Sequence, residues 1–64
     1  MSKLSNNHWQ PINSAPENLI VFTKIDDGRG KRNEQCLIRK GNLWWVPEGT
    51  VYVYYTPTHW KYIR

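Results

Sequence analysis

The sequence predicts an all-β fold, a small antiparallel sheet of about four strands in a meander, covered by aromatic segments from the N- and C-terminal ends. Apolar residues gather in short runs rich in β-branched and aromatic side chains, a pattern typical of strands. Glycine, proline and asparagine separate these runs, and no window shows a helical period. Four Trp, four Tyr and one Phe supply large rings for the core, at ~150–250 Å² each.

The length of 64 residues predicts one domain, which we expect to span residues 8–64 after a flexible N-terminus at 1–7. The opening "MSKLSNNHWQ" has no apolar run typical of a signal peptide, and no segment approaches the ~20 apolar residues of a membrane span. Cys36 is the one cysteine, so neither an intramolecular disulfide nor a cysteine zinc site is expected. These features favour a cytoplasmic protein without membrane contact.

The first two strands are predicted to form a hairpin. Pro11 and Pro16 favour extended or turn geometry ahead of a strand at 18–26, whose apolar groups on both faces indicate a central strand or one covered by the N-terminal segment. "DDGRGKRN" is a polar break with an Asp-Gly turn signal. A second strand follows at 34–41, where Cys36 shares a face with Ile38.

Two more strands are predicted at 43–46 and 50–55. Residues 50–55 alternate most regularly, and Pro57 ends this segment because it cannot donate to a ladder. Consecutive residues of a strand point to opposite faces, so one of Trp44 and Trp45 must point inward.

Both chain ends are expected to lie across the otherwise uncovered face of this sheet, because a lone small sheet needs something to pack on. We expect His59 to hydrogen-bond the backbone near the tail. The side chains expected to cover the face are Trp9, Ile12, Trp60 and Ile63, and those assigned structural roles are Trp9, Phe22, His59 and Trp60.

The motif residues Trp9-Gln10-Pro11-Ile12, Ala15-Pro16 and Thr58-His59-Trp60, with a mid-chain tryptophan, resemble those of a family of short uncharacterised phage and prophage proteins with a domain of unknown function. The likeness extends from Trp9 to Ile63, and the Thr-His-Trp end is its most specific part. Lys61-Tyr62-Ile63-Arg64 replaces the usual Met-Pro-Leu-Pro. The resemblance implies a small β domain, a phage or prophage origin and action in a bacterial host; it implies no activity.

Catalytic chemistry is not expected. Cys36, two histidines and the Asp26–Asp27 pair have no metal-ligand spacing, so no metal or cofactor is predicted. Cys36 on an alternating strand is better explained as a small hydrophobe than as a nucleophile for His59. A protein of this size is also expected to have little room for a pocket of ~300 Å³, so we predict neither an enzyme nor a small-molecule substrate.

Two functions from different classes fit the surface residues. The first is a protein-binding module that docks on a host or phage protein as an inhibitor or adaptor, through an aromatic surface or by sheet extension. The second is single-stranded nucleic-acid binding, in which rings stack on bases and cations follow the phosphates. A structural phage component is a third possibility. The candidate partner-binding residues are Arg29, Lys31, Arg32, Arg39, Lys40, Trp44, Tyr52 and Tyr54.

The formal charge of +4 favours contact with an acidic partner or nucleic acid. The basic residues are expected to divide, with Arg29, Lys31 and Arg32 at one end of the hairpin and Arg39 and Lys40 at the other.

Overall fold

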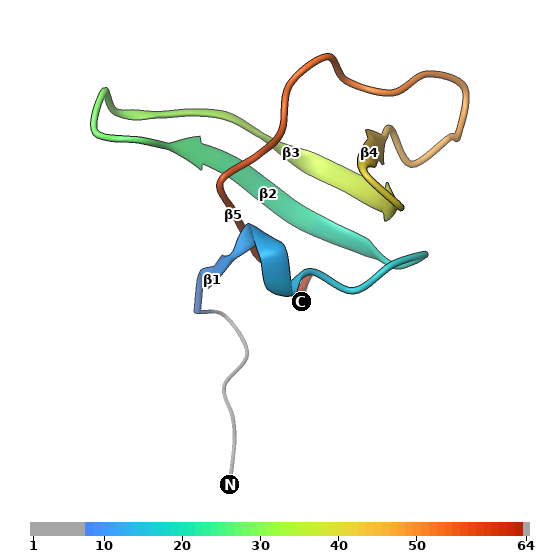
Figure 1. The fold of residues 1–64 in the computed structure, drawn as a ribbon, viewed down its shortest axis with the longest axis horizontal. Helices are drawn as coiled ribbons and strands as arrows, with labels where there is room; N and C mark the ends of the chain where they lie inside the picture. The colour runs from blue at the N-terminus through green and yellow to red at the C-terminus, as the bar shows by residue number, and fades with distance from the viewer. Residues whose placement is uncertain (1–7, 64) are drawn as a thin grey trace, which may run out of the picture.

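The computed structural model describes residues 8–63 and confirms the all-β fold class. Five strands form one antiparallel sheet in the order β1-β5-β2-β3-β4 (Figure 1). The elements are β1 (Gln10–Pro11), the short 3-10 helix η1 (Ile12–Ser14), β2 (Ile20–Asp26), β3 (Lys31–Lys40), β4 (Leu43–Trp45) and β5 (His59–Lys61). Among the described residues, no helix has the length and apolar character needed to cross a membrane.

The β2–β3 hairpin is the frame of the sheet. Its strands pair from Ile20 opposite Ile38 to Asp26 opposite Lys31. The turn between them uses glycine at Gly28, whose φ of 93° is unfavourable for residues with a Cβ. The predicted Asp-Gly turn is therefore confirmed, but β3 begins at Lys31, three residues before the predicted start. The register shifts between Thr23 and Ile25, as in a β-bulge.

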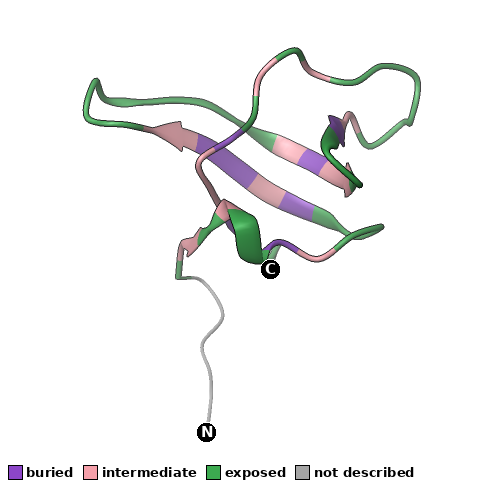
Figure 2. Ribbon diagram, viewed as in Figure 1, coloured by how far each residue is buried: buried purple, intermediate pink, exposed green. Residues whose placement is uncertain are grey.

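One face of this sheet holds the core. Val21, Leu37 and the Thr23 side chain are fully buried, and register places them on the same face. Trp44 and Trp60, each 4% exposed, extend this row to either side. Figure 2 shows the buried segments running along the middle of β2 and β3. Of the two alternatives predicted for the first strand, the central position is confirmed, since β2 pairs with both β3 and β5.

The predicted fourth strand at 50–55 is wrong. Within that segment Tyr52 makes one isolated bridge, to Trp45. The segment 46–58, which we call the covering connection, instead crosses the β2–β3 hairpin to reach β5 (Figure 1). Val46 and Val53 pack against the core cluster, and Pro57 is fully buried. Val53 buries apolar area over the core face, whereas Val51 is 57% exposed, so the alternation at 50–55 did not require a ladder.

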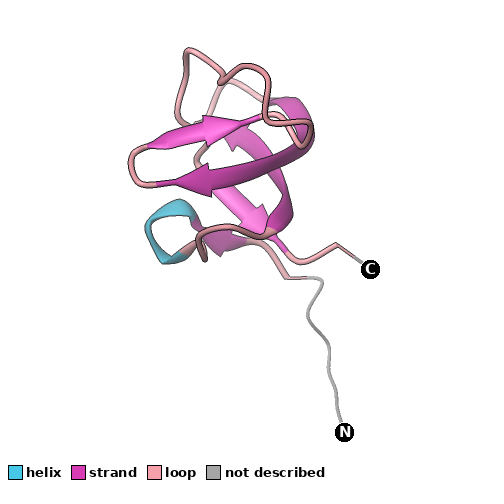
Figure 3. Ribbon diagram, turned by 90° about the vertical axis from the view of Figure 1, so that its right-hand side faces the viewer, coloured by secondary structure: helices cyan, strands magenta, loops and turns pink. Residues whose placement is uncertain are grey.

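The two ends of the protein join the sheet as strands instead of lying across it. β5 pairs with β2, and β1 pairs with β5. Ile12 and Trp60 do contribute to the core, and the Trp60 indole N–H donates to the Ser14 hydroxyl at 3.0 Å. Ile63 is 48% exposed and covers little. The strands curve, with η1 beside them (Figure 3). The predicted flexible segment 1–7 lies outside the described residues.

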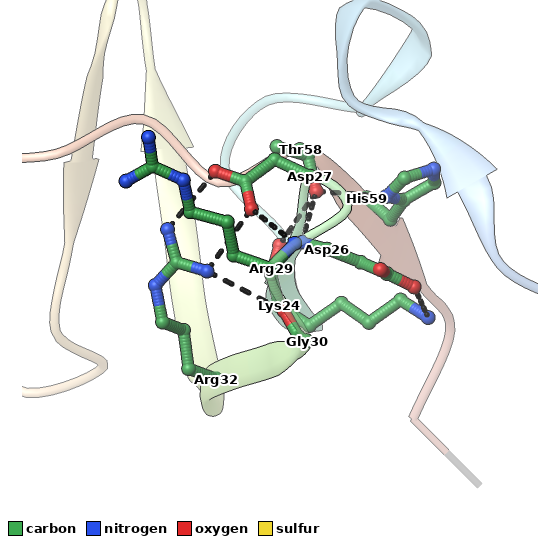
Figure 4. Close-up of polar contacts among 8 residues, drawn as sticks. All are labelled: Lys24, Asp26, Asp27, Arg29, Gly30, Arg32, Thr58 and His59. Carbon is green, nitrogen blue, oxygen red and sulfur yellow. Dashed lines mark hydrogen bonds and ion pairs between the residues drawn. The ribbon is translucent and has the colours of Figure 1, made fainter.

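An ion pair at the hairpin tip predicts a small acid dependence of stability. Arg32 donates from Nη2 to Asp27 Oδ2 at 2.9 Å (Figure 4). Its guanidinium hydrogen bond lowers the pKa of the Asp27 carboxyl below the ordinary 3.8. Because the pKa of Asp27 is lower in the folded protein than in the unfolded one, its ion pair stabilises the fold at a pH above the unfolded pKa. That stabilisation is lost as the pH falls through the folded pKa.

We therefore expect Asp27→Asn to lower the thermal midpoint slightly at pH 6 and to leave it unchanged near pH 2. The effect is small because both side chains are exposed and screened by solvent. Thermal unfolding followed by circular dichroism between pH 2 and 6 measures it. A difference between the variant and the parent that grows toward pH 2 contradicts the assignment.

Candidate interaction surface

The face of the sheet opposite the core is the candidate site, and we call it the outer face. Three cross-strand pairs lie side by side on this face, namely Ile20 with Ile38, Phe22 with Cys36, and Ile38 with Trp45. Lys61 lies opposite Phe22 on the other side of β2. The outer face comprises Trp9, Ile20, Phe22, Lys24, Cys36, Ile38, Lys40, Leu43, Trp45, Tyr52 and Lys61.

Trp9 closes one end of the outer face. Its ring lies 5.6 Å from that of Phe22, centroid to centroid, and the Nζ atoms of Lys24 and Lys61 lie 4.3 Å and 4.7 Å from the Trp9 ring. Lys24 is only 5% exposed, a costly position for an ammonium group without compensation. The Asp26 carboxylate, 3.2 Å from Lys24 Nζ, and the Trp9 ring compensate for the burial of this ammonium group. Lys61 is the more accessible cation of this pair.

Thr58 fastens β5 to the end of β2. Its backbone N–H donates to the Lys24 carbonyl at 2.9 Å, and its hydroxyl accepts the Asp26 N–H at 2.8 Å. The hydroxyl also lies 2.8 Å from His59 Nδ1 (Figure 4). The expectation that His59 bonds the backbone is therefore corrected, because its ring pairs with the Thr58 side chain. Of the other residues assigned structural roles, Trp60 lies in the core, whereas Trp9 and Phe22 lie on the outer face.

A second aromatic pair closes the other end of the outer face. The Trp45 and Tyr52 rings meet edge to face at 5.1 Å, and Lys40 Nζ lies 5.9 Å from the Trp45 ring. Between the two aromatic pairs the surface is aliphatic, with Ile20 43% exposed and half-buried Ile38 beside it. The outer face is thus apolar at its centre, with an aromatic pair and an accessible lysine at each end.

The three aromatic residues predicted to bind a partner, Trp44, Tyr52 and Tyr54, are not brought together. Trp44 lies in the core and is therefore not part of the outer face. Tyr54 is 94% exposed on the covering connection and stacks edge to face on Tyr55, away from Tyr52. Trp45 takes the place beside Tyr52. The alternation of consecutive residues showed that one tryptophan points outward but did not say which.

The basic residues divide between the two ends of the hairpin, as predicted, and several are already engaged. Arg29 and Lys31 are exposed near the tip, whereas Arg32 pairs with Asp27. At the opposite end Arg39 donates to two backbone carbonyls, and Lys40 lies over Trp45. The five predicted cations therefore do not form one patch.

A groove of about 320 Å³ lies beside the core, although little room for a pocket of that size was expected. Its lining residues are Ile12, Asn13, Arg39, Gly41, Asn42, Trp44 and Thr56. Within residues 8–63, no group of three or more His, Cys, Asp or Glu side chains is placed to hold a metal ion.

Comparisons with known proteins give no match for this sequence. No family model, curated protein or solved structure matches it.

Proposed function

We propose that the protein is a binding module, not an enzyme, that docks its outer face on an acidic protein with an apolar patch. The observation that carries the proposal is the half-exposed aliphatic centre between two aromatic pairs, with Lys40 and Lys61 accessible at its ends. Aromatic anchors around an apolar centre are typical of binding hot spots. The charge of +4 steers an acidic partner toward the protein.

Protein is favoured over single-stranded nucleic acid for two reasons. A nucleic-acid platform needs ring faces free for bases, yet Ile20 and Ile38 form the middle of this surface. It also needs cations that follow the phosphate backbone of the nucleic acid, yet Arg32 and Arg39 donate hydrogen bonds to acceptors within the protein. Nucleic acid therefore remains the alternative that the experiment below separates.

Docking by the face is also favoured over sheet extension. The edge strands β1 and β4 have two and three residues, so each offers a partner strand few ladder hydrogen bonds. β4 is further occupied by the bridge between Trp45 and Tyr52.

Our proposal includes a phage or prophage origin, with a host or phage protein as the partner and the bacterial cytoplasm as the place of action. The support is the resemblance in Trp9, Ala15-Pro16 and Thr58-His59-Trp60. Trp9, Ala15 and Thr58-His59-Trp60 hold the strands and the core together, so a shared motif there favours a shared fold. Members of such a family can then bind different partners, and the residues of the outer face determine which partner is inhibited or linked.

Capture from bacterial lysate with and without nuclease treatment, combined with footprinting of Cys36, tests the proposal. Cys36 lies on the outer face opposite Phe22 and is half-buried, so a docked partner slows its alkylation. We expect Trp45→Ala to weaken binding about 30-fold or more, as at a hot spot of ~2 kcal/mol. Tyr54→Ala is the matched control, since its exposed ring stacks on Tyr55, which hydrogen-bonds Gln35 on the core side of β3.

A protein retained by the parent and by Tyr54→Ala, lost with Trp45→Ala, and protective of Cys36 supports the proposal. Equal capture by all three proteins, or an unchanged alkylation rate, overturns it. Loss of capture after nuclease treatment assigns the surface to nucleic acid. Deletion of residues 1–7 provides a further check, since faster Cys36 alkylation in the free variant identifies the protein's own N-terminal segment as the occupant.

A further inference from the structure

We propose that the groove beside Trp44 is a second binding site, which takes a carboxylate carrying a short apolar group and uses Arg39 as its anchor. The groove lies on the core side of the sheet, between η1, the β3–β4 turn and the covering connection. It shares no residue with the outer face and is independent of the docking proposal.

Arg39 carries a positive charge that the described residues do not neutralise. Its Nε–H donates to the Gly41 carbonyl at 3.0 Å and its Nη1 to the Ala15 carbonyl at 2.8 Å. Both acceptors are neutral. Within residues 8–63 the ion pairs join Lys24 to Asp26 and Arg32 to Asp27, and none involves Arg39. The two carbonyls fix the guanidinium plane, and Nη2 meets no acceptor within residues 8–63, so its donors can serve a ligand.

The walls of the groove match a small amphipathic acid. The buried Trp44 ring and half-buried Ile12 offer apolar contact, while Asn13, Asn42 and Thr56 place neutral polar groups around the opening. The volume of about 320 Å³ lies at the lower end of small-molecule sites. A guanidinium held in one plane presents parallel donors to a carboxylate, which a lysine cannot do.

The charge of the site favours a carboxylate over a phosphate. Arg39 is the one cation among the lining residues, and the nearby Glu17 carboxylate accepts the Gly41 N–H at 3.2 Å. A doubly charged phosphate would face one guanidinium and a neighbouring negative charge. A single carboxylate balances the guanidinium, and its apolar group can reach Trp44.

NMR titration of the ¹⁵N-labelled full-length protein tests the site with matched probes. The probes are N-acetyl-L-leucine, its uncharged amide, acetate, and the peptide N-acetyl-Ala-Ala-Leu with a free carboxylate. We expect N-acetyl-L-leucine to shift the Arg39 Nε–H and Trp44 Nε1–H resonances with roughly millimolar affinity, and the amide to bind about tenfold more weakly. Tighter binding of the peptide identifies the C-terminus of a polypeptide as the source of the carboxylate, and equal binding identifies a free acid.

Variants separate the guanidinium fork from simple charge. We expect Arg39→Lys to weaken N-acetyl-L-leucine binding about fivefold or more, because it keeps the charge but loses the fork. Glu17→Gln should tighten binding by about twofold, because it removes a nearby negative charge while keeping an acceptor for Gly41. If Arg39→Lys fails to fold, Thr56→Val provides the second variant, with about a twofold loss expected from one hydroxyl.

Equal shifts with the acid and the amide, or no shift of either resonance at roughly 10 mM probe, overturn the proposal, because a site of useful affinity is then absent. Unchanged affinity in both Arg39→Lys and Thr56→Val also overturns it.

Discussion

Replacing Trp60 with alanine is expected to abolish cooperative folding at 37 °C. Trp60 is 4% exposed in the core, and its indole N–H is satisfied by the Ser14 hydroxyl. It lies on β5, which pairs with β1 on one side and β2 on the other. Removing a buried aromatic ring costs about 3–5 kcal/mol, and a core of this size supplies about the same amount in total.

Thermal and urea unfolding followed by circular dichroism measure this loss. Tyr62→Ala is the matched control, because Tyr62 stacks edge to face on Trp60 at 4.8 Å but is 42% exposed. We expect that control to cost about 0.5–1.5 kcal/mol, the size of an aromatic pair contact. Deletion of residues 59–64 should reproduce the Trp60→Ala result. A sharp, unshifted transition in the deletion variant would show that β5 is not part of the folding unit.

The hairpin could be predicted from sequence because its signals are local. β-branched residues at 20–26 and the Asp-Gly turn determine β2 and its turn without reference to any other segment. The apolar groups on both faces of this strand indicated a central strand or a covered one, and β2 is central in the sheet. These features depend on backbone preferences and on alternation, which act over a few residues.

The two ends of the protein and the covering connection could not be placed, because their structure depends on distant partners. β5 has three residues, and it is a strand because the edge of β2 pairs with it and the Thr58 hydrogen bonds hold it there. Val51 and Val53 alternate as a strand would, yet Val53 packs on the core from above. Alternation reports which side chains are apolar and leaves open whether a ladder or a cover buries them.

The candidate surface was predicted in part for a related reason. Tyr52 is on the outer face with Lys40 nearby, whereas Trp44 and Tyr54 are elsewhere. Which of two adjacent tryptophans faces outward depends on the register between β3 and β4, and no local signal sets that register. The buried Lys24 was not foreseen, because a charged residue normally indicates an exposed position.

Trp44 and Trp45 are adjacent but lie on opposite faces of β4, so we expect their replacement to lower the stability of the fold by different amounts. Trp44→Ala is expected to cost about 3–5 kcal/mol of unfolding free energy, because its ring is 4% exposed in the core. Trp45→Ala is expected to cost about 1 kcal/mol, since it removes the edge-to-face contact with Tyr52 from a half-buried surface. Urea titration of both variants measures the difference.

The comparison is informative because the two positions are neighbours on one strand and differ in the face of the sheet that they occupy. The substitution is chemically the same, and the two positions are adjacent in the unfolded state, so denatured-state effects largely cancel. The remaining difference therefore measures which ring the core needs. Equal costs, or a larger cost for Trp45→Ala, would reverse the assignment of the two faces. The docking surface would then move to the side that holds Trp44, and the Arg39 groove beside that ring would lose its wall.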